Sequence, residues 1–144
     1  MDFDVDEFLR QPLTAQVGTV TAATGPAVRP TWFLWEESAF WIHTGPWSRL
    51  PAQVQRDPRV AVVVEVCDLA TGLVRQVIAS GVCELLAFDI PRGQRLLRRY
   101  LGAEEADWDS RFQRYLHSAP DLGTGWLRLQ PHRLTAKDLS YRAA

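Results

Sequence analysis

The chain has 144 residues, the size of one domain, and 47% of them are hydrophobic, which is enough to build a core without disulfides or a bound metal. Its formal net charge of -1 and its pI of about 6.3 argue against a general nucleic-acid or anionic membrane surface, because both need a basic excess. We therefore expect one domain, residues 1–144, in which a local cluster of donors binds any anionic ligand.

The N-terminus and the cysteines indicate a cytoplasmic protein. Residues 1–7 are acidic where a signal peptide would be basic, and no apolar run approaches the length of a membrane span. Cys67 and Cys83 fall in strand-like apolar segments, so we expect two buried thiols in a reducing compartment. The sequence contains no zinc pattern, glycine-rich nucleotide loop or nucleophile elbow, so we predict no metal and name no catalytic residue.

Strand patterns dominate the chain. A Gly25-Pro26 turn joins the first two strand segments, and residues 68–72 form the turn of a central hairpin. Residues 60–66 are almost all apolar, which is typical of a strand that is covered on both faces. The predicted strands are residues 13–24, 28–36, 39–44, 60–66, 74–86, 126–131 and 134–139.

Helical spacing occurs in three segments, residues 48–56, 89–101 and 108–116. Ser48 and Asp89 can cap the first two, each with a proline in the first turn. In the third, Trp108, Phe112, Tyr115 and Leu116 recur at helical spacing, and we expect them to be core residues. The sequence thus predicts a mainly β protein, an antiparallel β-barrel with about three helices.

The turn from Thr44 to Gln53 has the chemistry of a phosphate site. Thr44 and Ser48 offer hydroxyl donors, Gly45 lets the backbone approach a ligand, and Arg49 offers a charged contact. The free amides at the start of a helix would add partial positive charge. The alternative is an ordinary capped helix with a solvent-exposed Arg49.

Four short motifs follow one another along residues 13 to 88. They are the segment Arg29-Pro30-Thr31-Trp32-Phe33 after the Gly25-Pro26 turn, the strand end Ile42-His43-Thr44-Gly45, the strand entry Asp57-Pro58-Arg59-Val60, and Ala79-Ser80-Gly81-Val82-Cys83-Glu84-Leu85. None is specific alone, but their order and spacing resemble the split β-barrel family of pyridoxamine 5'-phosphate oxidase-like flavin and deazaflavin proteins. The resemblance implies a split barrel, FMN or the deazaflavin coenzyme as cofactor, and a homodimer with the cofactor at the subunit interface.

The same resemblance implies roles for particular residues. The strand that lies along the flavin ring corresponds to Arg29, Pro30, Thr31 and Trp32, and the phosphate-holding residues correspond to Thr44, Ser48, Arg49 and Gln53. Gln76 corresponds to a position from which the second subunit reaches the edge of the ring. His43 could hydrogen-bond a cofactor or substrate oxygen, although a lone histidine is usually structural. We expect Trp47 to line the ligand site, whereas we expect Trp35 and Trp41 in the core or the dimer interface.

Position 50 departs from the family pattern. Leu50 stands where a lysine is usual, and Ala52 and Gln53 stand where asparagine or arginine is common. Arg49 is the nearest cation, but its side chain would leave the helix from a different face. The sequence therefore leaves open weak cofactor binding or a changed cofactor.

Three functions stay open from the sequence. The first is an oxidoreductase that moves a hydride between FMN, or the deazaflavin coenzyme, and a small planar organic substrate. The second is a carrier or sensor of a flavin, deazaflavin or haem-like ligand without turnover, and the third is a barrel that has lost its cofactor. A helix stripe of Arg92, Arg95 and Arg99, with Arg98 beside it, is either a solvated face or a site for the acidic tail of the deazaflavin coenzyme.

Overall fold

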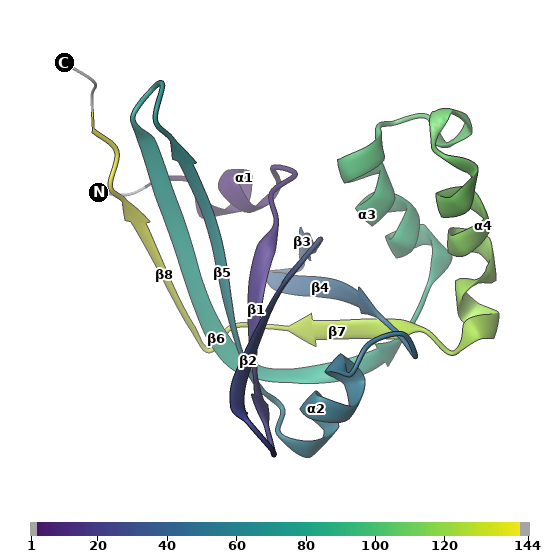
Figure 1. The fold of residues 1–144 in the computed structure, drawn as a ribbon. Helices are drawn as coiled ribbons and strands as arrows, with labels where there is room; N and C mark the ends of the chain where they lie inside the picture. Colours follow the sequence, from purple (N-terminus) through teal and green to yellow (C-terminus); the bar gives the residue numbers. More distant parts are fainter. Residues whose placement is uncertain (1–2, 142–144) are drawn as a thin grey trace.

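The computed structural model describes residues 3–141, which form a mainly antiparallel β structure with a pair of helices on one side (Figure 1). The strands are β1 (Ala15–Thr21), β2 (Gly25–Thr31), β3 (Leu34–Glu36), β4 (Ala39–Thr44), β5 (Arg59–Asp68), β6 (Leu73–Ala87), β7 (Gly125–Leu129) and β8 (Arg133–Asp138). The helices are α1 (Val5–Leu9), α2 (Leu50–Arg56), α3 (Ile90–Leu101) and α4 (Ser110–Ser118), with short 3-10 turns at Glu105–Asp107 and Ala119–Leu122. None of the helices described is long and apolar enough to span a membrane.

The strands are ordered β2-β1-β5-β6-β7-β4-β3, with β8 pairing to β6. All of these pairs are antiparallel. The 15-residue strand β6 pairs with β5 over residues 73–82, with β8 over residues 75–80 and with β7 over residues 83–87. It curves from one half of the barrel into the other (Figure 1). This shared strand makes the structure a split barrel and confirms the predicted fold class.

The main core lies between the two half-sheets. Alternate residues of β5, namely Val60, Val62 and Val64, are buried, whereas Ala61 and Glu65 on the other face are exposed. The prediction that residues 60–66 are covered on both faces is therefore wrong for a single chain, because no described element packs on the outer face. Trp35 and Trp41 are buried, as expected of core residues.

The predicted strand at residues 28–36 is two strands. β2 ends at Thr31 and β3 begins at Leu34, and the chain passes from one half-sheet to the other between them. The break is held by Tyr100, whose hydroxyl accepts a hydrogen bond from Phe33 N at 3.1 Å and donates one to Leu13 O at 2.6 Å. A side chain remote in sequence thus replaces strand pairing at this point.

Helix α1 differs from the prediction, whereas helix α3 agrees with it. Helix α1 was not predicted, because five residues give too short a pattern; Asp4 caps it by accepting a hydrogen bond from Glu7 N at 3.1 Å. Helix α3 begins as predicted, with Asp89 accepting from Arg92 N at 2.9 Å.

The arginine stripe of α3 faces the protein. Glu36 forms ion pairs with Arg92 at 2.7 Å and Arg95 at 2.8 Å, and the hydrogen bond from Arg95 is the main cause that holds the Glu36 pKa below its usual value. Arg92 also lies 3.6 Å from the centre of the Trp41 ring. These contacts attach the helical pair to β3 and β4, which leaves Arg92 and Arg95 engaged within the protein.

Arg99 makes the remaining attachment. Its guanidinium donates hydrogen bonds to Leu9 O at 2.6 Å and to Gln11 O, and it lies 4.5 Å from the Phe33 ring centre. Burial lowers the pKa of Arg99. By contrast, Arg98 is exposed and makes no side-chain hydrogen bond within residues 3–141. The structure therefore favours a packing role for most of the stripe over a site for an acidic cofactor tail.

We predict that Arg99→Met lowers the free energy of unfolding by about 2 kcal/mol, because the carbonyls of Leu9 and Gln11 lose a charged donor. Urea denaturation followed by tryptophan fluorescence measures this change. The control is Arg98→Met on the same helix, for which we expect a change within about 0.5 kcal/mol. Equal effects of the two substitutions would contradict the attachment role of Arg99.

Candidate functional site

A hollow of about 370 Å³ lies between β2, the end of β4 and the start of α2. β2 supplies three lining residues, β4 supplies the next three, and the connection into α2 supplies the rest. Its lining residues are Arg29, Pro30, Thr31, Ile42, His43, Thr44, Trp47, Ser48, Arg49 and Leu50. Nine of the twelve residues predicted from the sequence thus meet in one place, and Ile42 is an addition. Their binding role stays a prediction.

Arg29 provides a fixed positive charge at this hollow. Its guanidinium donates from Nη1 to Ser48 Oγ and from Nη2 to Gln53 Oε1, both at 2.9 Å. Thr19 donates to the same Gln53 oxygen at 3.0 Å. Within residues 3–141 no carboxylate forms an ion pair with Arg29. Gln53 therefore orients the cation from outside the hollow, and neutral partners leave its charge available to an anion.

Thr44 presents an unused hydroxyl. The residue is 3% exposed, and its Oγ1 has no hydrogen-bond partner among the described residues. Leaving such a group unpaired costs about 1–3 kcal/mol, so a ligand that pairs with it regains that energy. The free hydroxyl and the free guanidinium together fit a phosphate monoester.

The helix start contributes less than the sequence suggested. Leu50 N donates to Ser48 Oγ at 3.0 Å, and Pro51 has no N–H. The expectation of free amides is therefore wrong at these two positions of the seven-residue helix. Leu50 itself is 3% exposed and packs in the main core, while Arg49 is exposed at the rim. The cation that lines the hollow beside Arg49 is Arg29, which the sequence assigned to the ring.

His43 lies among aromatic rings at one end of the hollow. Its ring centroid is 4.4 Å from Phe88, 5.3 Å from Tyr115, 5.4 Å from Trp47 and 5.5 Å from Trp126. Its Nε2 is buried without a partner in the described part of the chain. Burial lowers the pKa of His43 to about 4, so the imidazole is neutral at pH 7.

Trp47 stands half-exposed beside His43. Its side chain is 56% exposed and packs on Gly45, where a Cβ atom would lie 2.3 Å from the indole ring. Tyr115 of α4 contacts it edge-on, with ring centroids 5.5 Å apart. The sequence assigned Tyr115 to the core, yet it is only partly buried and touches two residues of the hollow. No sequence signal distinguished it from its helical neighbours.

Besides Gln53, two predicted residues lie outside the hollow. Trp32 stacks on Tyr100, with centroids 4.4 Å apart and planes 6° apart, and on Phe112 at 6.0 Å. It packs under the helices and does not line the hollow. Gln76 lies on β6 between Glu65 and Lys137, outside the hollow of its own chain.

The cysteines and acidic residues offer no further chemistry at this place. Cys83 is buried and its pKa is raised to about 11 by burial, so it stays a thiol. Cys67 is exposed, which corrects the expectation that both cysteines are buried, because it lies near the uncovered end of β5. In the described part of the chain no three His, Cys, Asp or Glu side chains are grouped as metal ligands.

A family model described as pyridoxamine 5'-phosphate oxidase matches residues 1–137. The chain belongs to this family. No curated protein sequence matches it. The family assignment agrees with the split barrel.

Solved structures share the fold of this pyridoxamine 5'-phosphate oxidase family member. The conserved hypothetical protein Rv2991 from Mycobacterium tuberculosis is 18% identical, with a TM-score of 0.76 over 100% of this chain and 93% of that chain. An F420 reductase is 17% identical, with a TM-score of 0.68 over 94% and 98%. HutZ, described as the heme storage protein from Vibrio cholerae, is 17% identical, with a TM-score of 0.62 over 91% and 90%. At these identities the likeness shows the fold alone.

The buried His43 predicts a pH-dependent stability. Because its pKa falls from about 6.5 unfolded to about 4 folded, the unfolded state binds the extra proton between these values. The free energy of unfolding should therefore be greatest above pH 6.5 and decrease by up to about 3 kcal/mol as the pH falls to 4. Urea unfolding across this range measures it. His43→Gln lacks the titrating group, so its profile should be flatter; identical slopes would contradict the prediction.

Proposed function

We propose that this chain binds a phosphorylated flavin or deazaflavin, with FMN favoured as the family default, and moves a hydride to or from a small organic substrate. The observation that carries the proposal is the Arg29 guanidinium, held by Ser48 and Gln53 without a carboxylate partner. Such a cation is charged, oriented and free to bind a phosphate. It offers the positive charge that Leu50 does not provide.

The residues divide into two parts in this proposal. Arg29, Thr44, Ser48 and Arg49 hold the phosphate through charged and hydroxyl contacts. Thr31, on β2 at the edge of the sheet order, lies along the ring. The bound cofactor supplies the hydride chemistry, so the chain needs to hold the ring, orient the substrate and exclude water.

A carrier without turnover is the second candidate. His43 is neutral at pH 7, and burial raises the pKa of Tyr115 to about 12, so neither side chain readily releases a proton there. A storage protein such as HutZ has the same fold. The two functions differ in one measurable way. In an oxidoreductase, added substrate speeds the oxidation of the reduced cofactor or the reduction of the oxidised cofactor, whereas in a carrier it does neither.

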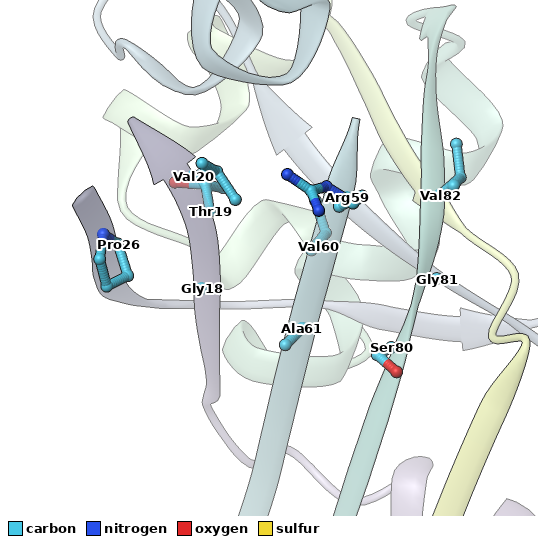
Figure 2. Close-up of a pocket in the computed structure, with 10 residues that line it drawn as sticks. All are labelled: Gly18, Thr19, Val20, Pro26, Arg59, Val60, Ala61, Ser80, Gly81 and Val82. Atoms are coloured by element: carbon cyan, nitrogen blue, oxygen red, sulfur yellow. The ribbon is translucent and has the colours of Figure 1, made fainter. Parts of the chain in front are cut away.

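We also propose a homodimer that covers the outer face of β1, β5 and β6. A hollow of about 500 Å³ lies on this face, where the small residues Gly18, Ala61 and Ser80 lie opposite one another on neighbouring strands (Figure 2). Val20 and Val82 at its edge are 37% and 52% exposed. Contact with a second copy would remove this apolar surface from water, which is favourable.

Gln76 fits the same dimer. Gln76 shares the alternate positions of β6 with Ile78, Ser80 and Val82. It therefore lies on the outer face of the strand, opposite the buried Val77. In such a dimer, Gln76 of one copy would reach the cofactor ring bound by the other copy, as the family resemblance implies. The cytoplasmic location stays a prediction of the sequence.

The cofactor proposal is tested by titrating the protein with FMN and with the deazaflavin coenzyme, followed by visible absorbance. We expect micromolar or tighter binding of one of them. Arg29→Met should weaken that binding at least about ten-fold and Arg49→Ala by at least about 1.5 kcal/mol, because each removes a charged hydrogen bond. The control is Arg56→Met, at the exposed end of α2. If the protein binds neither compound, the proposal is contradicted. If Arg29→Met binds the cofactor as tightly as the parent protein, Arg29 does not bind the phosphate.

The dimer proposal predicts a particle of about twice 16.3 kDa by light scattering. Ala61→Arg places a long charged side chain in the outer hollow, so the variant should be monomeric at micromolar concentration. Leu69→Arg is the control, because Leu69 is 74% exposed in the turn between β5 and β6. If the cofactor site needs both copies, Ala61→Arg should also lose cofactor affinity. A monomeric parent protein would overturn the proposal.

A further inference from the structure

His43 and Trp47 line one end of the hollow, and Tyr115 packs against both of them. The three residues come from β4, from the connection into α2 and from α4, so their arrangement depends on the helical pair being attached to the barrel. Each ring contacts the other two, with centroid distances of 5.3 to 5.5 Å. We call these three residues the aromatic wall.

Two surfaces of the aromatic wall are available to a ligand. Trp47 is 56% exposed, and its contact with Gly45 fixes the orientation of the indole. The Tyr115 hydroxyl makes no hydrogen bond within residues 3–141 and is not among the fully buried polar atoms. A flat ring can stack on the first, and a hydrogen-bond acceptor can pair with the second.

The aromatic wall carries no charge at neutral pH. His43 is kept neutral by burial, and Tyr115 keeps its proton for the same reason. The cations of the hollow are Arg29 and Arg49, which the proposed function assigns to the cofactor phosphate, and no carboxylate lines the hollow. An anion would therefore find no free cation beside a bound cofactor, and a cation would find no carboxylate.

We propose that the aromatic wall binds the second substrate, an uncharged planar ring compound that stacks on Trp47 and accepts a hydrogen bond from Tyr115 Oη. The inference rests on the proposed function for the position of the cofactor phosphate. Tyr115 is then a residue that selects the substrate, supplied by the helical pair rather than by the barrel. His43 packs against the rings of both Trp47 and Tyr115 and so helps to fix their positions.

Three related ligands test each part of this proposal. Naphthalene can only stack, 2-acetonaphthone adds a neutral acceptor, and 2-naphthoate adds a negative charge. Calorimetric titration of the FMN-saturated protein should give binding of the ketone, with the carboxylate at least about ten-fold weaker. The variants are Trp47→Leu and Tyr115→Phe, with Tyr141→Phe as control because Tyr141 is exposed beyond β8.

We expect Trp47→Leu to weaken naphthalene and the ketone at least about ten-fold. Tyr115→Phe should weaken the ketone about five-fold and leave naphthalene unchanged, since only the hydroxyl is lost. The Tyr141 variant should match the parent protein. Absence of ketone binding by the parent, or equal binding by Trp47→Leu, would overturn the aromatic wall as a ligand site. An unchanged ketone affinity in Tyr115→Phe would overturn the role of its hydroxyl.

The outcomes also separate this inference from the proposed function. If FMN binds and the ketone does not, the inference alone fails. If neither FMN nor the deazaflavin coenzyme binds, the proposed function fails, and the same titrations on the free protein still decide whether the aromatic wall holds a neutral ring. Ketone binding that Trp47→Leu abolishes would support the aromatic wall in either case.

Discussion

The double pairing of β6 is the constraint on which the rest of the structure depends. One strand cannot serve two half-sheets unless it curves, and its antiparallel partners β5 and β7 follow that curve. β7 in turn carries β4, and β5 carries β1 and β2. The end of β4 therefore lies across the hollow from β2, although about a dozen residues separate Thr31 from Thr44 in the chain. The hollow is a consequence of this pairing and not of any local motif.

Charge within the hollow is arranged by neutral hydrogen-bond partners. Arg29 is oriented by an amide oxygen and a hydroxyl, so its charge is not cancelled as it would be by a carboxylate. The arginines of α3 show the opposite arrangement, since Arg92 and Arg95 are paired with Glu36. The same residue type thus serves packing on one side of the barrel and is available for anion binding on the other.

The aromatic clusters follow a similar division. Trp32 stacks on Tyr100 of α3, and both rings are partly buried among other side chains. Trp47 has the same chemistry but lies over Gly45 with much of its ring exposed. The difference comes from the helical pair, which covers one set of rings and reaches only the edge of the other. In our proposal this uncovered edge is where the chain can distinguish one substrate from another.

Periodicity and capping residues in the sequence predicted a mainly β barrel and most of its elements, because these depend on local geometry. The order and spacing of four motifs carried the family resemblance, and that resemblance implied the split barrel and nine residues that line the hollow. These patterns could not determine that β2 and β3 belong to different half-sheets, that Cys67 is exposed or that the outer face of β5 lacks cover. Nor could they distinguish Tyr115 from its helical neighbours, or show that Gln53 orients Arg29. The last two features depend on contacts between residues 72 and 24 positions apart, and only the tertiary structure fixes such contacts.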